Sequence, residues 1–167
     1  MRKIIILLVF LGTHHNFYSQ ENKIPDVQVT TSNGEKIQIL DKIDKLTIID
    51  YWATWCKPCI AEMLFLEKIE KKYAGKLDII SISVDNSEGP WKKYITKKNK
   101  TGHQYWIDSQ NSLMELITEE VTLRDGQKGI SWSIPRFLLV DKDGKILNSD
   151  CPPPSTGSLD TLIEKNL

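Results

Sequence analysis

The chain has 167 residues, which is enough for one α/β domain with a proper core but too short for two. Its 22 lysines and arginines balance its 22 aspartates and glutamates, so no overall field favours nucleic acid or an anionic membrane surface as a partner. Three cysteines are far fewer than a disulfide scaffold uses, and two of them share one motif, which favours a reactive pair over a structural one.

The first twenty residues have the pattern of an export signal. Arg2 and Lys3 precede an apolar run, residues 4–11, that is too short to span a bilayer but suits the central region of a secretory signal. A polar exit with a weak cleavage site follows. We therefore expect a signal peptide over residues 1–19, or an uncleaved N-terminal membrane anchor, then one domain over residues 20–167, and a periplasmic or secreted location.

The rest of the chain alternates strand and helix patterns. Residues 27–31 and 35–39 flank an Asn-Gly turn and predict an N-terminal β-hairpin. Residues 46–52 are nearly all apolar, a helical periodicity follows and ends at Gly75, and residues 77–84 return to strand character, so this βαβ unit predicts two parallel strands with a right-handed crossover. The same patterns predict a helix, a short strand, a short helix, a second hairpin and a closing helix, over residues 87–100, 104–107, 111–117, 137–147 and 159–167.

A two-cysteine motif lies between the strand and the helix of the βαβ unit. In Trp55-Cys56-Lys57-Pro58-Cys59, two residues separate the cysteines at the first turn of the predicted helix, where they can close a small disulfide. The helix N-terminus and Lys57 stabilise a thiolate on Cys56, the expected nucleophile. Pro58 fits this geometry because a first-turn proline loses an N–H that has no partner within the helix.

The chain resembles the thioredoxin fold in this motif, in the residues before it (Ile-Asp-Tyr-Trp-Ala-Thr, positions 49–54), and in Ile134-Pro135 ahead of a strand. The opening hairpin, the export signal and the Val-Asp-Lys-Asp-Gly-Lys run at 140–145 resemble the exported TlpA/ResA-like branch over residues 24–167. The resemblance implies a central mixed β-sheet flanked by helices and thiol–disulfide oxidoreductase activity, and we expect no cofactor. It also implies that Pro135 is a cis-proline facing the dithiol and that the Ile134 backbone pairs with an incoming substrate strand.

Two carboxylates are candidate proton acceptors for this dithiol. Asp50 lies six residues before Cys56 on a strand with the pattern of a buried one, so its pKa is expected to be raised, and it can take the proton from Cys59. By resemblance, Asp50 matches the buried aspartate of thioredoxins, and Glu62 matches a glutamate that many exported members carry beside their dithiol. A paired strand-end carboxylate for Asp50 and an exposed helix residue for Glu62 remain the alternatives.

The chain departs from the family pattern around the cis-proline. Arg136 follows Pro135 where threonine is common, which puts either a cation near the substrate groove or an ordinary surface arginine there. The segment before the cis-proline, residues 118–133, is longer than expected. It is either a loop that determines specificity or a plain surface insertion. The expected substrate-binding residues are Trp55, Lys57, Pro58, Ile134, Pro135 and Arg136.

The sequence thus predicts an exported, monomeric thiol–disulfide oxidoreductase that reduces protein disulfides, with a membrane thiol–disulfide transporter as electron donor by resemblance. Cys56 attacks the substrate disulfide and Cys59 resolves the mixed disulfide. No metal is expected, since zinc needs four ligands and one such motif supplies two. Cys151 has no nearby second cysteine and is expected to be a spare thiol, with a resolving or intermolecular role as the alternative. One alternative is a peroxiredoxin-like peroxidase, disfavoured because Trp52 replaces a threonine four residues before the reactive cysteine. Another is a non-enzymatic binding module with a structural Cys56–Cys59 bridge.

Overall fold

The computed structural model describes residues 22–167, so the expected signal over residues 1–19 lies outside the described residues. The strands are β1 (Gln28–Thr31), β2 (Lys36–Gln38), β3 (Leu46–Trp52), β4 (Leu77–Ser83), β5 (His103–Trp106), β6 (Thr118–Thr122), β7 (Lys128–Trp132), β8 (Arg136–Val140) and β9 (Ile146–Asn148). The α-helices are α1 (Lys57–Lys72), α2 (Glu88–Lys97) and α3 (Ser158–Asn166), and the short 3-10 helices are η1 (Leu40–Lys42), η2 (Ser112–Ile117) and η3 (Pro154–Thr156). Within the described residues, the helices are all too short or too polar to cross a membrane.

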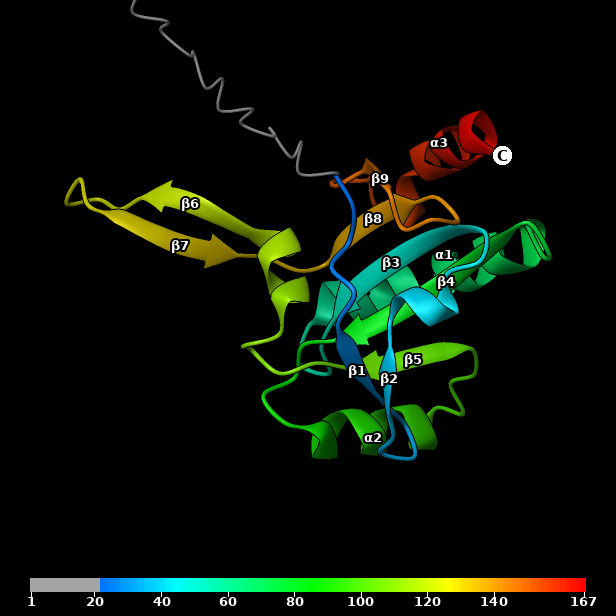
Figure 1. The fold of residues 1–167 in the computed structure, drawn as a ribbon, viewed down its shortest axis with the longest axis horizontal. Coiled ribbons are helices and arrows are strands. Elements are labelled where there is room, and N and C mark those ends of the chain that lie inside the picture. The colour runs from blue at the N-terminus through cyan, green and yellow to red at the C-terminus, as the bar shows by residue number, and fades with distance from the viewer. Residues whose placement is uncertain (1–21) are drawn as a thin grey trace, which may run out of the picture.

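A mixed sheet forms the centre of the molecule (Figure 1), with strand order β2-β1-β5-β4-β3-β8-β9. The predicted βαβ unit is present: β3 and β4 pair in parallel, from Leu46 opposite Leu77 to Trp52 opposite Ser83. β8 pairs antiparallel with β3 on its other side and β1 pairs antiparallel with β5, so the sheet is mixed. The architecture therefore confirms the predicted thioredoxin-like α/β fold.

Helices cover both faces of this sheet, which explains why every residue of β3 is buried. Leu66 and Ile69 of α1 and Leu159 and Ile163 of α3 are buried in one cluster with Ile48 of β3. On the opposite face, Trp91 and Ile95 of α2 belong to a cluster that contains Tyr51. Because side chains alternate along a strand, Asp50 shares the face of Ile48 and lies in the layer between the sheet and α1.

The predicted N-terminal hairpin extends the sheet at one edge. β1 and β2 pair antiparallel, from Gln28 opposite Gln38 to Thr30 opposite Lys36. The turn between them contains Gly34 with φ +90°, a conformation that glycine adopts without steric cost. β1 then pairs with β5, which joins the hairpin to the sheet. The second predicted hairpin is also present, as β8 and β9.

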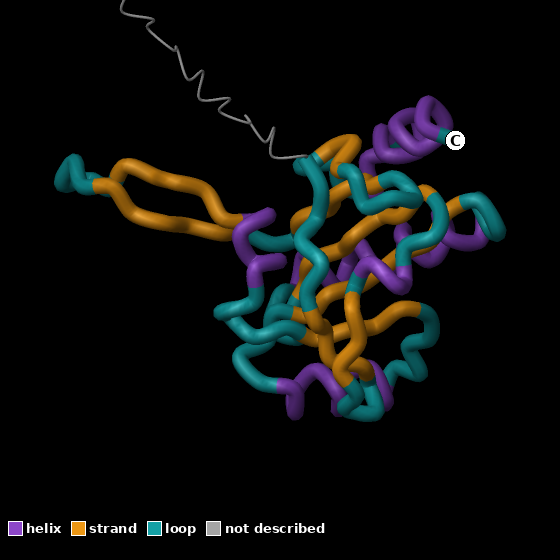
Figure 2. The backbone as a smooth tube through the Cα atoms, viewed as in Figure 1, coloured by secondary structure: helices purple, strands orange, loops and turns teal. Residues whose placement is uncertain are grey.

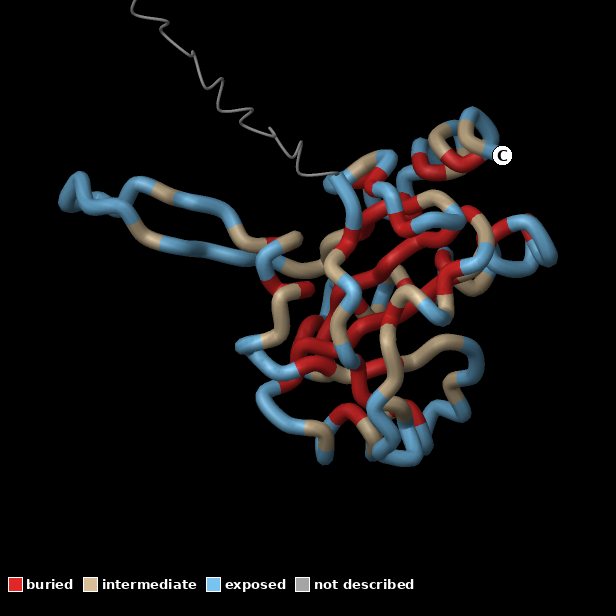
Figure 3. The backbone as a smooth tube through the Cα atoms, viewed as in Figure 1, coloured by how far each residue is buried: buried red, intermediate tan, exposed pale blue. Residues whose placement is uncertain are grey.

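The stretch expected as a long loop, residues 118–133, instead contains a second, separate sheet. β6 and β7 pair antiparallel, from Thr118 opposite Trp132 to Thr122 opposite Lys128. Figure 2 shows this hairpin projecting from the body of the molecule, and Figure 3 shows that it is largely exposed, in contrast to the central strands. Neither strand contributes a buried residue, so the sequence lacks the apolar alternation that marks a half-buried strand.

Candidate active site

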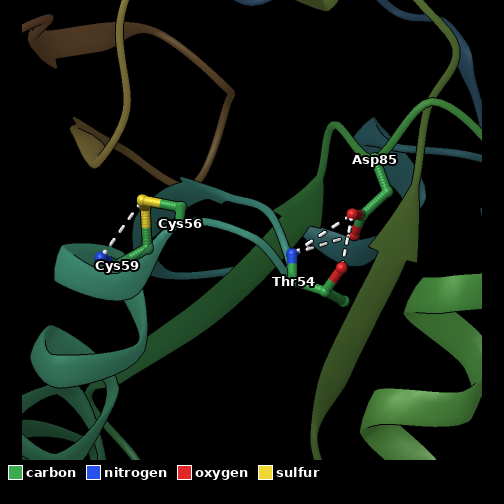
Figure 4. Close-up of a disulfide and its surroundings, with 4 residues drawn as sticks. All are labelled: Thr54, Cys56, Cys59 and Asp85. Carbon is green, nitrogen blue, oxygen red and sulfur yellow. Dashed lines mark hydrogen bonds between the residues drawn. A yellow bond between two sulfur atoms is a disulfide. The ribbon is translucent and has the colours of Figure 1, made fainter.

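The two cysteines of the motif form a disulfide at the start of α1, with their Cα atoms 5.3 Å apart. Cys56 is the N-cap residue of the helix, and its sulfur accepts a hydrogen bond from the Cys59 backbone N–H at 3.2 Å (Figure 4). Pro58 stands in the first turn, as predicted. Both cysteines are buried, with 5% of Cys56 and 2% of Cys59 exposed, so Cys56 is the slightly more accessible of the two. The helix N-terminus can therefore stabilise negative charge on the Cys56 sulfur.

A buried aspartate that sequence reasoning missed holds the turn just before this disulfide. The Asp85 carboxylate accepts hydrogen bonds from the Thr54 backbone N–H at 3.2 and 3.1 Å and from the Thr54 hydroxyl at 2.7 Å (Figure 4). The Ser83 hydroxyl also donates to this carboxylate, at 2.8 Å. Asp85 follows the carboxyl end of β4, which lies beside the carboxyl end of the parallel strand β3. A polar residue just after a strand that pairs in parallel with β3 was the feature of the sequence that could have indicated this site.

Because Asp85 fixes this turn, Asp85→Ala is expected to lower the free energy of unfolding by about 1–3 kcal/mol, since it leaves the Thr54 N–H without its acceptor. Asp85→Asn keeps one acceptor oxygen and should lose less. Urea denaturation checks this order, with Asp26→Ala as the control because Asp26 is an exposed aspartate. Equal stability of the Asp85→Ala and Asp26→Ala proteins would contradict the assignment.

Asp50 is buried in the layer beneath α1, with 1% of its surface exposed. Its carboxylate accepts a hydrogen bond from the Ser81 hydroxyl at 3.3 Å. Burial raises the pKa of Asp50 from 3.8 to about 7, and the charge of Glu62 adds to this rise, while Ser81 and Lys100 oppose it. The expected direction of the pKa shift is confirmed. Asp50 therefore changes its protonation state near neutral pH.

Glu62 lies in α1, half-buried, and is held by the segment before α3. Its two carboxylate oxygens accept hydrogen bonds from the Ser155 backbone N–H at 2.8 Å and from the Ser155 hydroxyl at 2.7 Å. The Glu62 side chain thus connects α1 to η3. Glu62 is close enough to Asp50 for its charge to raise the pKa of that residue.

The Ile134–Pro135 peptide bond is cis, as the resemblance implies. Arg136, the next residue, pairs with Tyr51 near the carboxyl end of β3, so Pro135 lies at the edge of the sheet from which the cysteine motif continues. Ile134 packs against the core cluster that contains both cysteines.

Arg136 is not the surface arginine of the alternative interpretation, because only 13% of its side chain is exposed. Its guanidinium binds the carboxylates of Glu119 at 2.6 Å and Asp150 at 3.0 Å. Since Glu119 belongs to β6, Arg136 ties the projecting hairpin to β8. The cation expected near the substrate groove is thus paired with two carboxylates.

The hairpin also meets the cysteine motif through two tryptophans. The ring centroids of Trp55 and Trp132 lie 6.4 Å apart with the planes inclined by 57°, a geometry typical of aromatic contacts. Trp132 was not among the predicted site residues, since its proximity to Trp55 depends on the path of the hairpin. Lys57 and Pro58, which follow Cys56 in the chain, are exposed.

Cys151 is a free, buried thiol, in agreement with the prediction of a spare cysteine. It packs in the cluster that contains Leu159 and Ile163 of α3. Burial raises its pKa to about 12, so it is protonated at neutral pH.

Comparisons with known proteins agree with this geometry. The Redoxin family pattern matches residues 19–163. The thiol–disulfide oxidoreductase ResA of Bacillus thuringiensis (strain Al Hakam) is 26% identical over 98% of this chain and 94% of its own. A crystal structure from Bacteroides vulgatus, provisionally designated a thiol–disulfide oxidoreductase, is 34% identical with a TM-score of 0.70 and covers 88% of this chain and 96% of that one. A thiol–disulfide oxidoreductase from Bacteroides fragilis NCTC 9343 shares the fold, with 20% identity, a TM-score of 0.61, and coverage of 84% and 98%.

The fold, the disulfide at the start of α1 and these relatives define an enzyme of the thiol–disulfide oxidoreductase class. The chain belongs to the Redoxin family, and within it to the TlpA/ResA-like proteins of thioredoxin fold.

Proposed function

We propose that this protein is exported and reduces disulfides in other proteins through Cys56 and Cys59. The observation that carries the proposal is the Cys56–Cys59 disulfide at the N-terminus of α1, directly after the central strand β3. A disulfide in this position has a sulfur whose thiolate the helix terminus stabilises.

The reaction consists of two exchanges and transfers two electrons to the substrate. The Cys56 thiolate attacks one substrate sulfur, forms a mixed disulfide, and displaces the other substrate sulfur as a thiolate. Cys59 then loses its proton to the Asp50 carboxylate and attacks the Cys56 sulfur. This step breaks the mixed disulfide, releases the second substrate thiolate and leaves the Cys56–Cys59 disulfide that the structure contains.

We infer the reducing direction from the negative charges of Asp50 and Glu62, which act against the stabilisation of the Cys56 thiolate by the helix N-terminus and Lys57. Above pH of about 7 Asp50 is an anion, and the charge of Glu62 lies nearby. Negative charge opposes the thiolates of the reduced form and therefore favours the disulfide form of this protein, which makes the dithiol a better electron donor. A membrane thiol–disulfide transporter is the proposed source of the two electrons that regenerate the dithiol.

Export is proposed from the signal pattern of residues 1–19, cleaved or retained as an anchor. The proposed location is periplasmic or secreted, and the proposed working form is a monomer without a cofactor. The proposed partners are proteins whose disulfide or thiol exchanges with Cys56.

Insulin reduction tests the activity directly. With dithiothreitol as the electron source, the protein is expected to precipitate the insulin B chain faster than dithiothreitol alone, and hydrogen peroxide is expected not to be consumed. Cys151→Ser serves as the control, because the thiol it removes is buried away from this chemistry. Peroxide turnover in place of insulin reduction would favour the peroxidase, and an inert bridge in dithiothreitol would favour the binding module.

A further inference from the structure

The β6–β7 hairpin has no role in the hydrophobic core, yet it carries large apolar side chains. Ile130 is 78% exposed and Trp132 is 42% exposed, and Trp55 beside them is 56% exposed. The two strands of the hairpin pair only with each other and project from the body of the molecule (Figure 1). Exposed apolar side chains that gather in one place mark interaction sites more often than isolated ones do.

The register of the hairpin puts these side chains on one face. Side chains directly opposite each other in an antiparallel pair share a face, and the faces alternate along each strand. Thr118 opposite Trp132 and Glu120 opposite Ile130 therefore belong to the same face. We call this face, with Ile130 and Trp132 on β7 and Trp55 at its base, the docking face.

On the opposite face of the hairpin, a side chain from the end of β6 packs over the backbone of β7. Val121 lies opposite Gly129. The Leu123 side chain lies within 3.2–3.3 Å of the position that a Cβ atom on Gly129 would occupy, so Leu123 packs over the glycine backbone. Leu123 is 47% exposed and supplies a control on this second face.

Several contacts hold the base of the hairpin next to the disulfide. The Thr118 hydroxyl donates to the Met114 carbonyl at 2.7 Å, and the Arg136 guanidinium binds Glu119 at 2.6 Å. Trp132 contacts Trp55, which directly precedes Cys56. A polypeptide bound along the docking face therefore extends as far as Trp55, the residue directly before Cys56.

The two charged side chains on this face are of opposite sign, so they add no net charge that would attract a charged ligand. Lys128 and Glu120 form an ion pair at 3.1 Å on the same face, and they neutralise each other. Ile130 and Trp132 stand two residues apart on one strand, a spacing that matches alternate side chains of an extended polypeptide. A second copy of this chain bound here would cover Trp55 and obstruct the disulfide, whereas a substrate must approach it.

We propose that the docking face binds an extended segment of the substrate polypeptide that carries apolar or aromatic side chains beside its disulfide cysteine. This inference rests on the proposed function and names the class of substrate for the same site. Apolar contacts along the hairpin hold the substrate segment while Cys56 attacks the sulfur of the substrate cysteine.

Two synthetic peptides test the proposal, each carrying one cysteine in a mixed disulfide with 2-nitro-5-thiobenzoate. One peptide has leucine and phenylalanine beside the cysteine, and the other has serine and glycine at the same positions. The full chain is reduced, freed of reductant and mixed with each peptide, and the released chromophore gives a second-order rate constant. We expect the wild type to react about 10-fold faster with the apolar peptide.

The variants locate this preference. Ile130→Ser and Trp132→Ser are each expected to reduce the ratio of the two rate constants to about 3-fold or less, and the double variant to about 1. Leu123→Ser makes the matched change on the opposite face and is expected to keep the wild-type ratio. Circular dichroism and urea midpoints equal to those of the wild type show that the variants are folded.

The outcomes separate this inference from the proposed function. If the wild type reacts with neither peptide, the proposed function fails. Equal rate constants with both peptides would leave the function in place and overturn the docking face. An equal loss of preference in Leu123→Ser would also overturn it, as would a wild-type dimer that Ile130→Ser dissociates in sedimentation experiments, because the face then binds a second copy.

Discussion

Replacing Cys59 with serine is expected to trap mixed disulfides between Cys56 and protein substrates, whereas Cys56→Ser is expected to trap none. Cys56 attacks first because it is the N-cap of α1 and its sulfur accepts the Cys59 N–H. Without the Cys59 sulfur, the second exchange cannot occur and the mixed disulfide persists. Non-reducing electrophoresis of extracts from the exporting cell measures the trapped species.

Both variants should reduce insulin no faster than dithiothreitol alone, because each lacks one sulfur of the pair. The control is Cys151→Ser in the Cys59→Ser background, which should trap the same partners because Cys151 is buried and protonated. Equal trapping by Cys56→Ser and Cys59→Ser would contradict the assignment of Cys56 as the attacking residue and Cys59 as the resolving residue.

Asp50→Asn is expected to stabilise the fold at neutral and alkaline pH. Burial raises the pKa of Asp50 from 3.8 to about 7, so the folded state binds a proton more tightly than the unfolded state. The cost of ionising this carboxylate in the fold therefore begins above pH 3.8 and is complete above about pH 7. The variant should gain up to about 4 kcal/mol at pH 8, from 1.4 kcal/mol per pKa unit, and little at pH 4. Urea midpoints of the oxidised proteins across this range measure the gain.

The activity of the same variant should fall. In the wild type, the rate of the resolving step should rise with pH through about 7 as Asp50 becomes able to accept the Cys59 proton. Asp50→Asn should lose this rise and resolve a preformed mixed disulfide on the order of 100-fold more slowly at pH 8. Single-turnover release of a substrate thiol measures the step.

Two further variants identify the acceptor. The Ser81 hydrogen bond lowers the pKa of Asp50, so Ser81→Ala should shift the rise in rate to higher pH. Glu62→Gln should slow resolution less than Asp50→Asn, and a larger effect would make Glu62 the principal acceptor. An Asp50→Asn protein that is less stable and resolves at the wild-type rate would show that Asp50 is an ordinary structural carboxylate.

The parts of the fold that were predictable from the sequence are those whose residues face a core. β3 and the helix after it carry continuous and periodic apolar patterns because the sheet is covered on both faces. The start of α1 was predictable because its cysteines and Pro58 have residue-specific geometric roles at a helix N-terminus. The raised pKa of Asp50 followed from a charged residue within a buried strand.

The parts that were not predictable depend on contacts between distant segments. The β6–β7 hairpin has the polar sequence of a loop because its strands contribute no residue to the core. The role of Asp85 depends on β4 ending beside β3, 31 residues away from the Thr54 that it binds. Likewise, the contact of Trp132 with Trp55 and the pairing of Arg136 with Glu119 arise only when the base of the hairpin lies beside β8 and the cysteine motif.

The buried Cys151 thiol has a consequence for the fidelity of electron transfer. A third thiol that ionised at neutral pH could attack the Cys56–Cys59 disulfide and scramble it into an unproductive pairing. Cys151 is shielded in the core beneath α3, and its pKa is raised to about 12. Cys151 therefore takes no part in the exchange reactions. The protein carries two electrons per cycle, through Cys56 and Cys59, although its chain contains three cysteines.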